Sequence, residues 1–122
     1  MRPRCLALAI LLCSGASQAA DDHPSRDQDA LCFTAIARQF EATRGGPADE
    51  AKLAQEMLRA EPYFAGKVRA GFSDAELPGI LTSADAQMSK DPKRREYAIS
   101  CWQIFQIEMM IITNAAQGKP VK

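Results

Sequence analysis

Apolar residues recur at intervals of three and four positions through most of this chain of 122 residues. That period places them on one side of an α-helix, whereas half-buried strands need apolar and polar residues to alternate, and no segment shows such alternation. Glycine and proline residues divide the pattern into segments that are long enough for helices. The sequence therefore predicts an all-α protein, a compact bundle of four to five helices.

The first nineteen residues have the layout of a secretory signal peptide. Arg2 and Arg4 make the start basic, residues 5–13 form an apolar run, and Ser17 and Ala19 supply small side chains before the cut. The alternative is a retained membrane anchor, but a spanning helix needs about 20 apolar residues. We predict cleavage after Ala19 and export to the periplasm or the exterior.

The mature chain has the length and charge of one small domain. Loss of the signal leaves thirteen basic against fifteen acidic residues, a net charge of −2. That balance predicts no nucleic-acid partner, since such binders carry a strong basic excess. We expect a flexible segment over 20–28, a single helical domain over 29–118 and a tail over 119–122, with no stable membrane insertion.

Turn residues and capping patterns divide the helical domain. The first helix is predicted over 29–44, with Ser25 and Gln28 resembling a capping box before it. Pro62 interrupts the next apolar stripe, so that either one helix kinks there or two helices follow in series, and we favour the second. Ser73 and Glu76 resemble another capping box, before a short helix. The last and longest helix is predicted over 92–117.

Two cysteines remain after Cys5 and Cys13 leave with the signal. Cys32 and Cys101 fall on the apolar faces of the first and last predicted helices. Two thiols in an oxidising compartment most simply form one disulfide. The sequence predicts a Cys32–Cys101 bridge, the alternative being a pair of buried free thiols.

The back of the last helix is poor in charge and offers a candidate interaction surface, formed by Ile99, Gln103, Gln106 and Met110. A large exposed apolar patch usually marks a contact site, for a protein partner or a second copy. The alternative is a central helix that the other helices cover on all sides.

Glu108 falls inside the apolar arc of the same helix and is a candidate buried polar site. Burial disfavours an ionised carboxylate unless a cation pairs with it. The alternatives are an ion pair with Arg38, Lys67 or Arg69, or a helix rotated so that the carboxylate reaches water.

The remaining polar residues give no catalytic or metal-binding constellation. His23 is the only histidine and falls in the polar segment before the first helix. The sequence has no glycine-rich phosphate loop and no Cys-x-x-Cys. We expect no enzymatic activity, no cofactor and no metal site. Lys90 and residues 93–95 form a basic cluster that either contacts anionic lipid or is a solvated turn.

Three motifs carry a resemblance to small exported two-cysteine helical proteins of alphaproteobacteria. They are Leu31-Cys32-Phe33, the segment Tyr63-Phe64-Ala65-Gly66-Lys67-Val68, and Ser100-Cys101. The resemblance implies a helical fold and export, and it assigns no activity. This chain departs from the pattern in its unusually apolar stretch over 102–112.

These observations support two hypotheses of function. The first is a non-enzymatic module that binds another envelope protein, or a second copy, through the apolar last helix, as chaperones, inhibitors and immunity proteins do. The alternative is a carrier that holds a small hydrophobic ligand between its helices, with Glu108 as the polar anchor.

Overall fold

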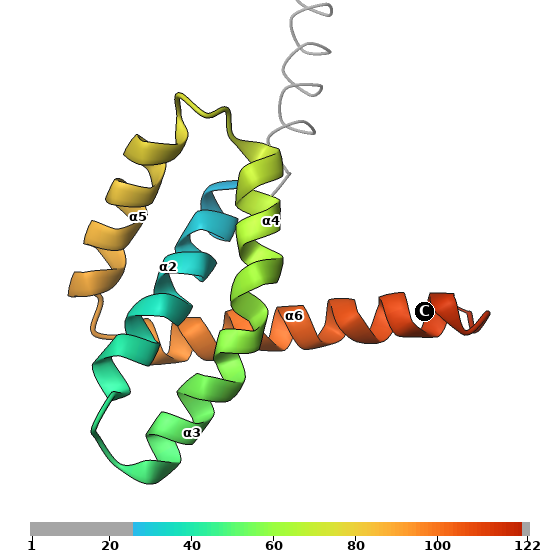
Figure 1. The fold of residues 1–122 in the computed structure, drawn as a ribbon, viewed down its shortest axis with the longest axis horizontal. Helices are drawn as coiled ribbons and strands as arrows, with labels where there is room; N and C mark the ends of the chain where they lie inside the picture. The colour runs from blue at the N-terminus through green and yellow to red at the C-terminus, as the bar shows by residue number, and fades with distance from the viewer. Residues whose placement is uncertain (1–25, 121–122) are drawn as a thin grey trace, which may run out of the picture.

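The computed structural model describes residues 26–120. Within that range the chain is all-α, as predicted, with α2 at the centre and the other helices packed around it (Figure 1). The predicted signal peptide with its cleavage point, His23 and the Ser25 cap lie outside the described residues. The helices are α2 (Arg26–Thr43), α3 (Ala48–Met57), α4 (Glu61–Gly71), α5 (Leu77–Lys90) and α6 (Arg94–Ala116), with a 3-10 turn, η1 (Leu58–Ala60).

Helix α2 begins at Arg26, so the prediction of a flexible segment reaching residue 28 is wrong. Asp27 and Asp29 lie in its first turn, where the helix dipole favours negative charge. Their carboxylates therefore favour a helix that starts before residue 29. The helix ends before Gly45, whose φ of 73° is the left-handed conformation that suits glycine.

Pro62 separates two helices in series, as favoured from the sequence. It occupies the first turn of α4, where a backbone N–H would have no intrahelical acceptor, so proline costs no hydrogen bond there. The intervening η1 keeps right-handed helical backbone angles at both of its caps, so α3 and α4 run on with little change of direction (Figure 1).

The predicted capping-box hydrogen bonds form in the turn that leads into α5. The Ser73 N–H donates to Glu76 Oε1 at 3.1 Å, and the Glu76 N–H donates to Ser73 Oγ at 3.3 Å. Pro78 lies in the first turn, where its lack of an N–H costs no intrahelical hydrogen bond. The helix extends to Lys90 and is therefore longer than the short element that we predicted, because Ala84 and Met88 continue its buried face.

Helix α6 is joined to α2 by the Cys32–Cys101 disulfide, whose two Cα atoms lie 5.5 Å apart. Both cysteines belong to the main core, so the predicted pairing and the core position of both residues are confirmed. The buried members of that core are Cys32, Ala35, Ile36, Ala54, Met57, Ala60, Phe64, Met88, Ala98 and Cys101.

A smaller apolar cluster lies where α2, α4 and α5 meet, at the end of the bundle away from α6. Its buried members are Ala30, Val68, Phe72 and Ala84. Arg26 lies over the Phe72 ring, and its guanidinium donates a hydrogen bond to the Gly71 carbonyl at 3.2 Å. These contacts fix the turn between α4 and α5 against the start of α2.

Candidate interaction surface on the last helix

Only the first part of α6 packs against the bundle. Tyr97, Ile99, Trp102 and Phe105 are partly buried against the main core, and Tyr63 of α4 meets Phe105 with ring centroids 5.6 Å apart. The C-terminal part of the helix projects away from the other helices (Figure 1). We call residues 104–116 the α6 arm.

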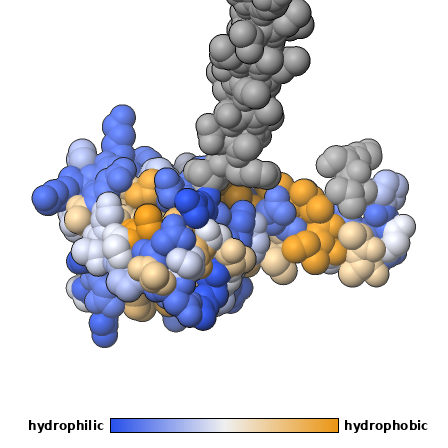
Figure 2. Space-filling model, turned by 90° about the horizontal axis from the view of Figure 1, so that it is seen from above, coloured by the Kyte–Doolittle hydropathy of each residue, from blue (hydrophilic) through white to orange (hydrophobic). Residues whose placement is uncertain are grey.

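The α6 arm leaves large apolar side chains in solvent. Figure 2 shows them gathered on the projecting part of the molecule. Their exposed fractions range from 38% to 56%. The residues are Ile104, Ile107, Met109, Met110 and Ile112. Contiguous exposed apolar side chains of this kind are typical of interaction surfaces.

One row of side chains runs along α6 from the bundle into the arm. Cys101, Glu108 and Ala115 are spaced seven residues apart, so they lie on one face of the helix. Cys101 is buried against α2, whereas Ala115 is exposed and Glu108 is partly exposed. The face that packs inside the bundle thus continues beyond it uncovered.

The predicted strip on the back of α6 lies partly in the segment that packs on the bundle and partly in the exposed arm. Ile99 is partly buried and packs on the main core. Gln103, Gln106 and Met110 are exposed, with Met110 at 56% the most exposed large apolar side chain. A candidate surface therefore excludes Ile99 and includes Ile107, which flanks the predicted strip.

Glu108 lies in the arm and is partly exposed, as in the alternative that its carboxylate reaches water. The three cations named as possible partners pair with other carboxylates (Arg38 with Asp85, Lys67 with Asp29, Arg69 with Asp74). Glu108 is not among the residues that line three of the best-formed hollows of residues 26–120. It is the anchor that the ligand-carrier hypothesis requires, so its position gives that hypothesis no support.

A groove over α2, between α4 and α5, was not predicted from the sequence. Two adjoining hollows of 170 and 330 Å³ form it, and both are lined by Phe33 and Leu81. Helices α4 and α5 each pack on α2 but hardly contact each other. The groove is therefore open along one side.

Three rows of residues at a spacing of four line or border the groove, one row from each helix. The hint in the sequence was this i, i+4, i+8 spacing, but a row of three is too short to tell a groove from a core. The rows are Phe33, Ala37 and Glu41 on α2, Glu61, Ala65 and Arg69 on α4, and Leu77, Leu81 and Asp85 on α5.

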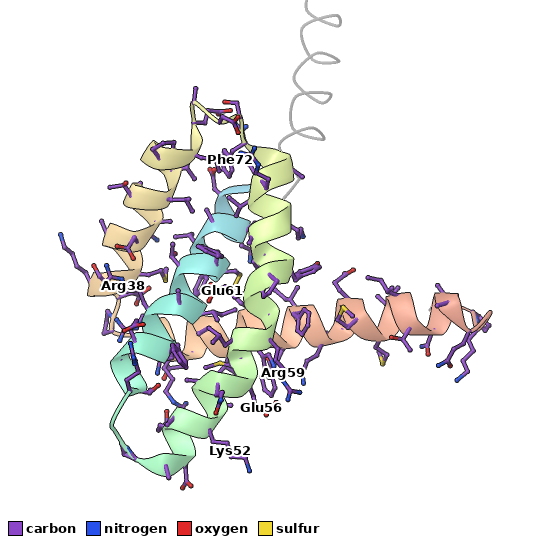
Figure 3. The ribbon with its side chains drawn as sticks, viewed as in Figure 1. Arg38, Lys52, Glu56, Arg59, Glu61 and Phe72 are labelled. Carbon is purple, nitrogen blue, oxygen red and sulfur yellow. A yellow bond between two sulfur atoms is a disulfide. The ribbon has the colours of Figure 1, made fainter. Side chains whose placement is uncertain are left out.

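Charged side chains of both signs lie at the end of the groove nearest α6. Glu61 is there on α4 and Arg38 on α2 (Figure 3). Burial raises the pKa of the Glu61 carboxyl. The Arg38 guanidinium donates hydrogen bonds to Asp85, and these bonds chiefly lower the pKa of that carboxyl. Arg69 lies at the opposite end and pairs with Asp74, so each end of the groove carries an ion pair.

The basic cluster near the start of α6 takes part in the fold. Arg95 donates two hydrogen bonds to the Glu50 carboxylate of α3, at 2.8 and 2.9 Å, and Arg94 donates to Gln39 of α2 at 3.2 Å. Lys90 and Lys93 are exposed. Two of the four residues in the cluster, Arg94 and Arg95, thus connect α6 to α2 and α3.

No helix within residues 26–120 has both the length and the hydropathy needed to cross a membrane. No three histidine, cysteine, aspartate or glutamate side chains come together as metal ligands would in that range. Comparison of the chain with protein-family models, curated proteins and solved structures finds no match.

Proposed function

We propose that this protein is an exported, non-enzymatic protein-binding module and that the α6 arm is its binding element. The observation that carries the proposal is the exposure of five large apolar side chains on one projecting helix. The arm is anchored at its packed end by the Cys32–Cys101 disulfide. A partner would therefore meet an apolar surface that is held in place before binding.

The composition of the arm favours a protein partner. Fully burying one large aliphatic side chain stabilises by about 1.5–3 kcal/mol, so covering five that are about half exposed would gain about 5 kcal/mol. Between Tyr97 and Gly118 the only charged residue is Glu108. Little charge would thus lose its hydration when a partner covers the arm.

Export is supported by the cysteines and by the predicted leader. A disulfide in a small protein persists in an oxidising compartment such as the periplasm or the exterior. The basic start and short apolar run of the leader fit the same route. The resemblance to small exported two-cysteine proteins also supports it.

Site-specific photo-crosslinking in the native cells tests the proposal. A photoreactive amino acid replaces Ile107 in the arm or, as a matched control, the exposed Gln55 of α3. We expect one discrete protein adduct from position 107 and none from position 55. Adducts at both positions, or at neither, would contradict a binding role for the arm.

A double substitution checks that the adduct depends on the apolar surface. Ile107→Lys with Met110→Glu should abolish crosslinking from a probe at Ile112, because it places two charges in the contact. Both residues are more than half exposed, so the melting temperature should change by less than about 3 °C. An unchanged adduct yield in this variant would refute the assigned surface.

A further inference from the structure

The sulfur atoms of residues 26–120 lie in two different environments. The two cysteines are each 1% exposed and are already joined in the disulfide. Met57 and Met88 belong to the main core and are 1% and 0% exposed. Met109 and Met110, by contrast, are 41% and 56% exposed and are neighbours in the α6 arm. Within the described range, the sulfur that solvent can reach is therefore confined to the arm.

The two exposed methionines lie on different sides of the arm. Consecutive residues of an α-helix point roughly 100° apart, and residues three apart are neighbours on its surface. Met110 is three residues from Ile107, and Met109 is three residues from Ile112, so each thioether lies next to an exposed isoleucine. A partner that covers either side of the arm would thus cover one thioether.

A thioether in solvent is open to an oxidation that a buried thioether resists. The sulfur lone pair attacks one oxygen of a peroxide, and an S–O bond forms as the O–O bond breaks. With hydrogen peroxide, the proton on the transferred oxygen passes to the departing hydroxide, which leaves as water. The sulfur is oxidised to a sulfoxide and the peroxide is reduced. The sulfoxide oxygen accepts hydrogen bonds, so burying it without a donor costs free energy.

We propose that Met109 and Met110 form an oxidation-sensitive modification site, where a peroxide converts both thioethers to sulfoxides and weakens the binding of a protein partner. The effect on binding rests on the proposed function of the arm, whereas the selective oxidation does not. The fold should survive, because Met57 and Met88 are out of reach unless the bundle opens. Methionine sulfoxide reductases return a sulfoxide to the thioether with electrons from a dithiol, and the oxygen leaves as water, so the change is reversible.

Peptide mass spectrometry on the natively processed, disulfide-bonded protein treated with hydrogen peroxide tests the selectivity. We expect Met109 and Met110 each to gain one oxygen atom at least about tenfold faster than Met57 or Met88. The melting temperature of the oxidised protein should fall by less than about 3 °C, because both side chains lie on the exposed arm. Similar rates at all four methionines would overturn the proposal.

Photo-crosslinking from position 107 in the native cells, with and without a pulse of hydrogen peroxide, tests the effect on binding. The adduct yield of the otherwise wild-type chain should fall at least about fivefold after the pulse. The matched variant, Met109→Leu with Met110→Leu, keeps an apolar surface of similar size but has no sulfur there. Its yield should match that of the wild-type chain without peroxide, and should stay within roughly twofold of that value after the pulse.

Two crosslinking results would overturn the effect on binding. One is a wild-type yield that stays unchanged while the peptides show both sulfoxides. The other is an equal loss in the leucine variant, which would place the decisive oxidation outside the arm. The proposed function and this inference can fail separately. An adduct that survives oxidation of the arm removes this inference alone, whereas an arm without any adduct in untreated cells removes the proposed function and, with it, the effect on binding.

Discussion

At the scale of single residues, the disulfide is the largest individual contribution that the structure allows us to estimate. Cys32 and Cys101 are separated by 69 positions, and closing a loop of that length in the unfolded chain gives about 4 kcal/mol in the chain-entropy account. Cys32→Ala with Cys101→Ala should lower the free energy of unfolding by about that amount, as measured by urea titration. The control is a reductant, which should destabilise wild type and leave the variant unchanged. Equal stability of the oxidised wild type and the variant would contradict the estimate.

The capping box at the start of α5 gives a second prediction for a single residue. Ser73→Ala removes the hydroxyl that accepts from the Glu76 N–H and donates to Glu76 Oε1 at 2.9 Å. Loss of such a cap costs about 1 kcal/mol of the free energy of unfolding. Ser83→Ala, at an exposed position within the same helix, should cost less than about 0.5 kcal/mol. Chemical denaturation of both variants measures the difference, and equal costs would show that the box does not stabilise α5.

At the scale of the helices, local signals in the sequence were enough to predict most of the elements. Gly45, Pro62 and the Ser73–Glu76 pair each act within a few residues, so their effects on helix ends can be predicted without the fold. The length of α5 was missed because its buried face after Leu81 consists of Ala84 and Met88 alone. Their burial depends on α2 and on the main core, which local patterns do not reveal.

The uncovered arm could not be predicted from periodicity, because the apolar pattern of α6 is the same inside and outside the bundle. Cys101 and Ile112 belong to one stripe, yet one is buried and the other is 53% exposed. The difference arises because α2 and α4 pack against α6 near Cys101 but do not extend alongside the arm. The same reasoning explains why Glu108 was expected to be a buried site and is instead partly exposed in the arm.

A matched pair of alanines tests this division of α6. Ala98 and Ala116 are eighteen residues apart, five full helical turns, so they share one side of the helix. Ala98 is fully buried, and Ala98→Leu should lower the free energy of unfolding by about 1–3 kcal/mol through overpacking. Ala116→Leu should change it by less than about 0.5 kcal/mol, because Ala116 is exposed. Urea titration of both variants is the measurement, and similar costs would show that the arm is packed.

At the scale of the whole molecule, charged pairs connect helices that the apolar core alone would hold less specifically. Arg38–Asp85 joins α2 to α5, Glu50–Arg95 joins α3 to α6, and Asp29–Lys67 joins α2 to α4. All three pairs lie at or near the surface, where an ion pair adds little stability in neutral solution. Their clearer consequence is a dependence of stability on pH, since two of the carboxyls have lowered pKa values.

Stability should therefore decrease in acid. Hydrogen bonds from Arg38 and Arg95 chiefly lower the pKa of Asp85 below its ordinary value of 3.8 and that of Glu50 below 4.5. A carboxyl whose pKa is lower in the folded state stabilises the fold above its unfolded pKa, and that contribution is lost as the pH falls through the folded pKa. Burial raises the pKa of Glu61, which acts in the opposite direction, but only at one residue.

The double variant Asp85→Asn with Glu50→Gln tests this account. It should be less stable than wild type at pH 7, because both hydrogen-bonded carboxylates are gone, and it should lose less stability between pH 7 and about pH 3. Urea titrations at the two pH values give the comparison, with Asp49→Asn, an exposed carboxylate of α3 in none of the ion pairs found among residues 26–120, as the control. If the double variant loses as much stability in acid as wild type does, the acid sensitivity belongs to other carboxyls and these two pairs do not couple the helices.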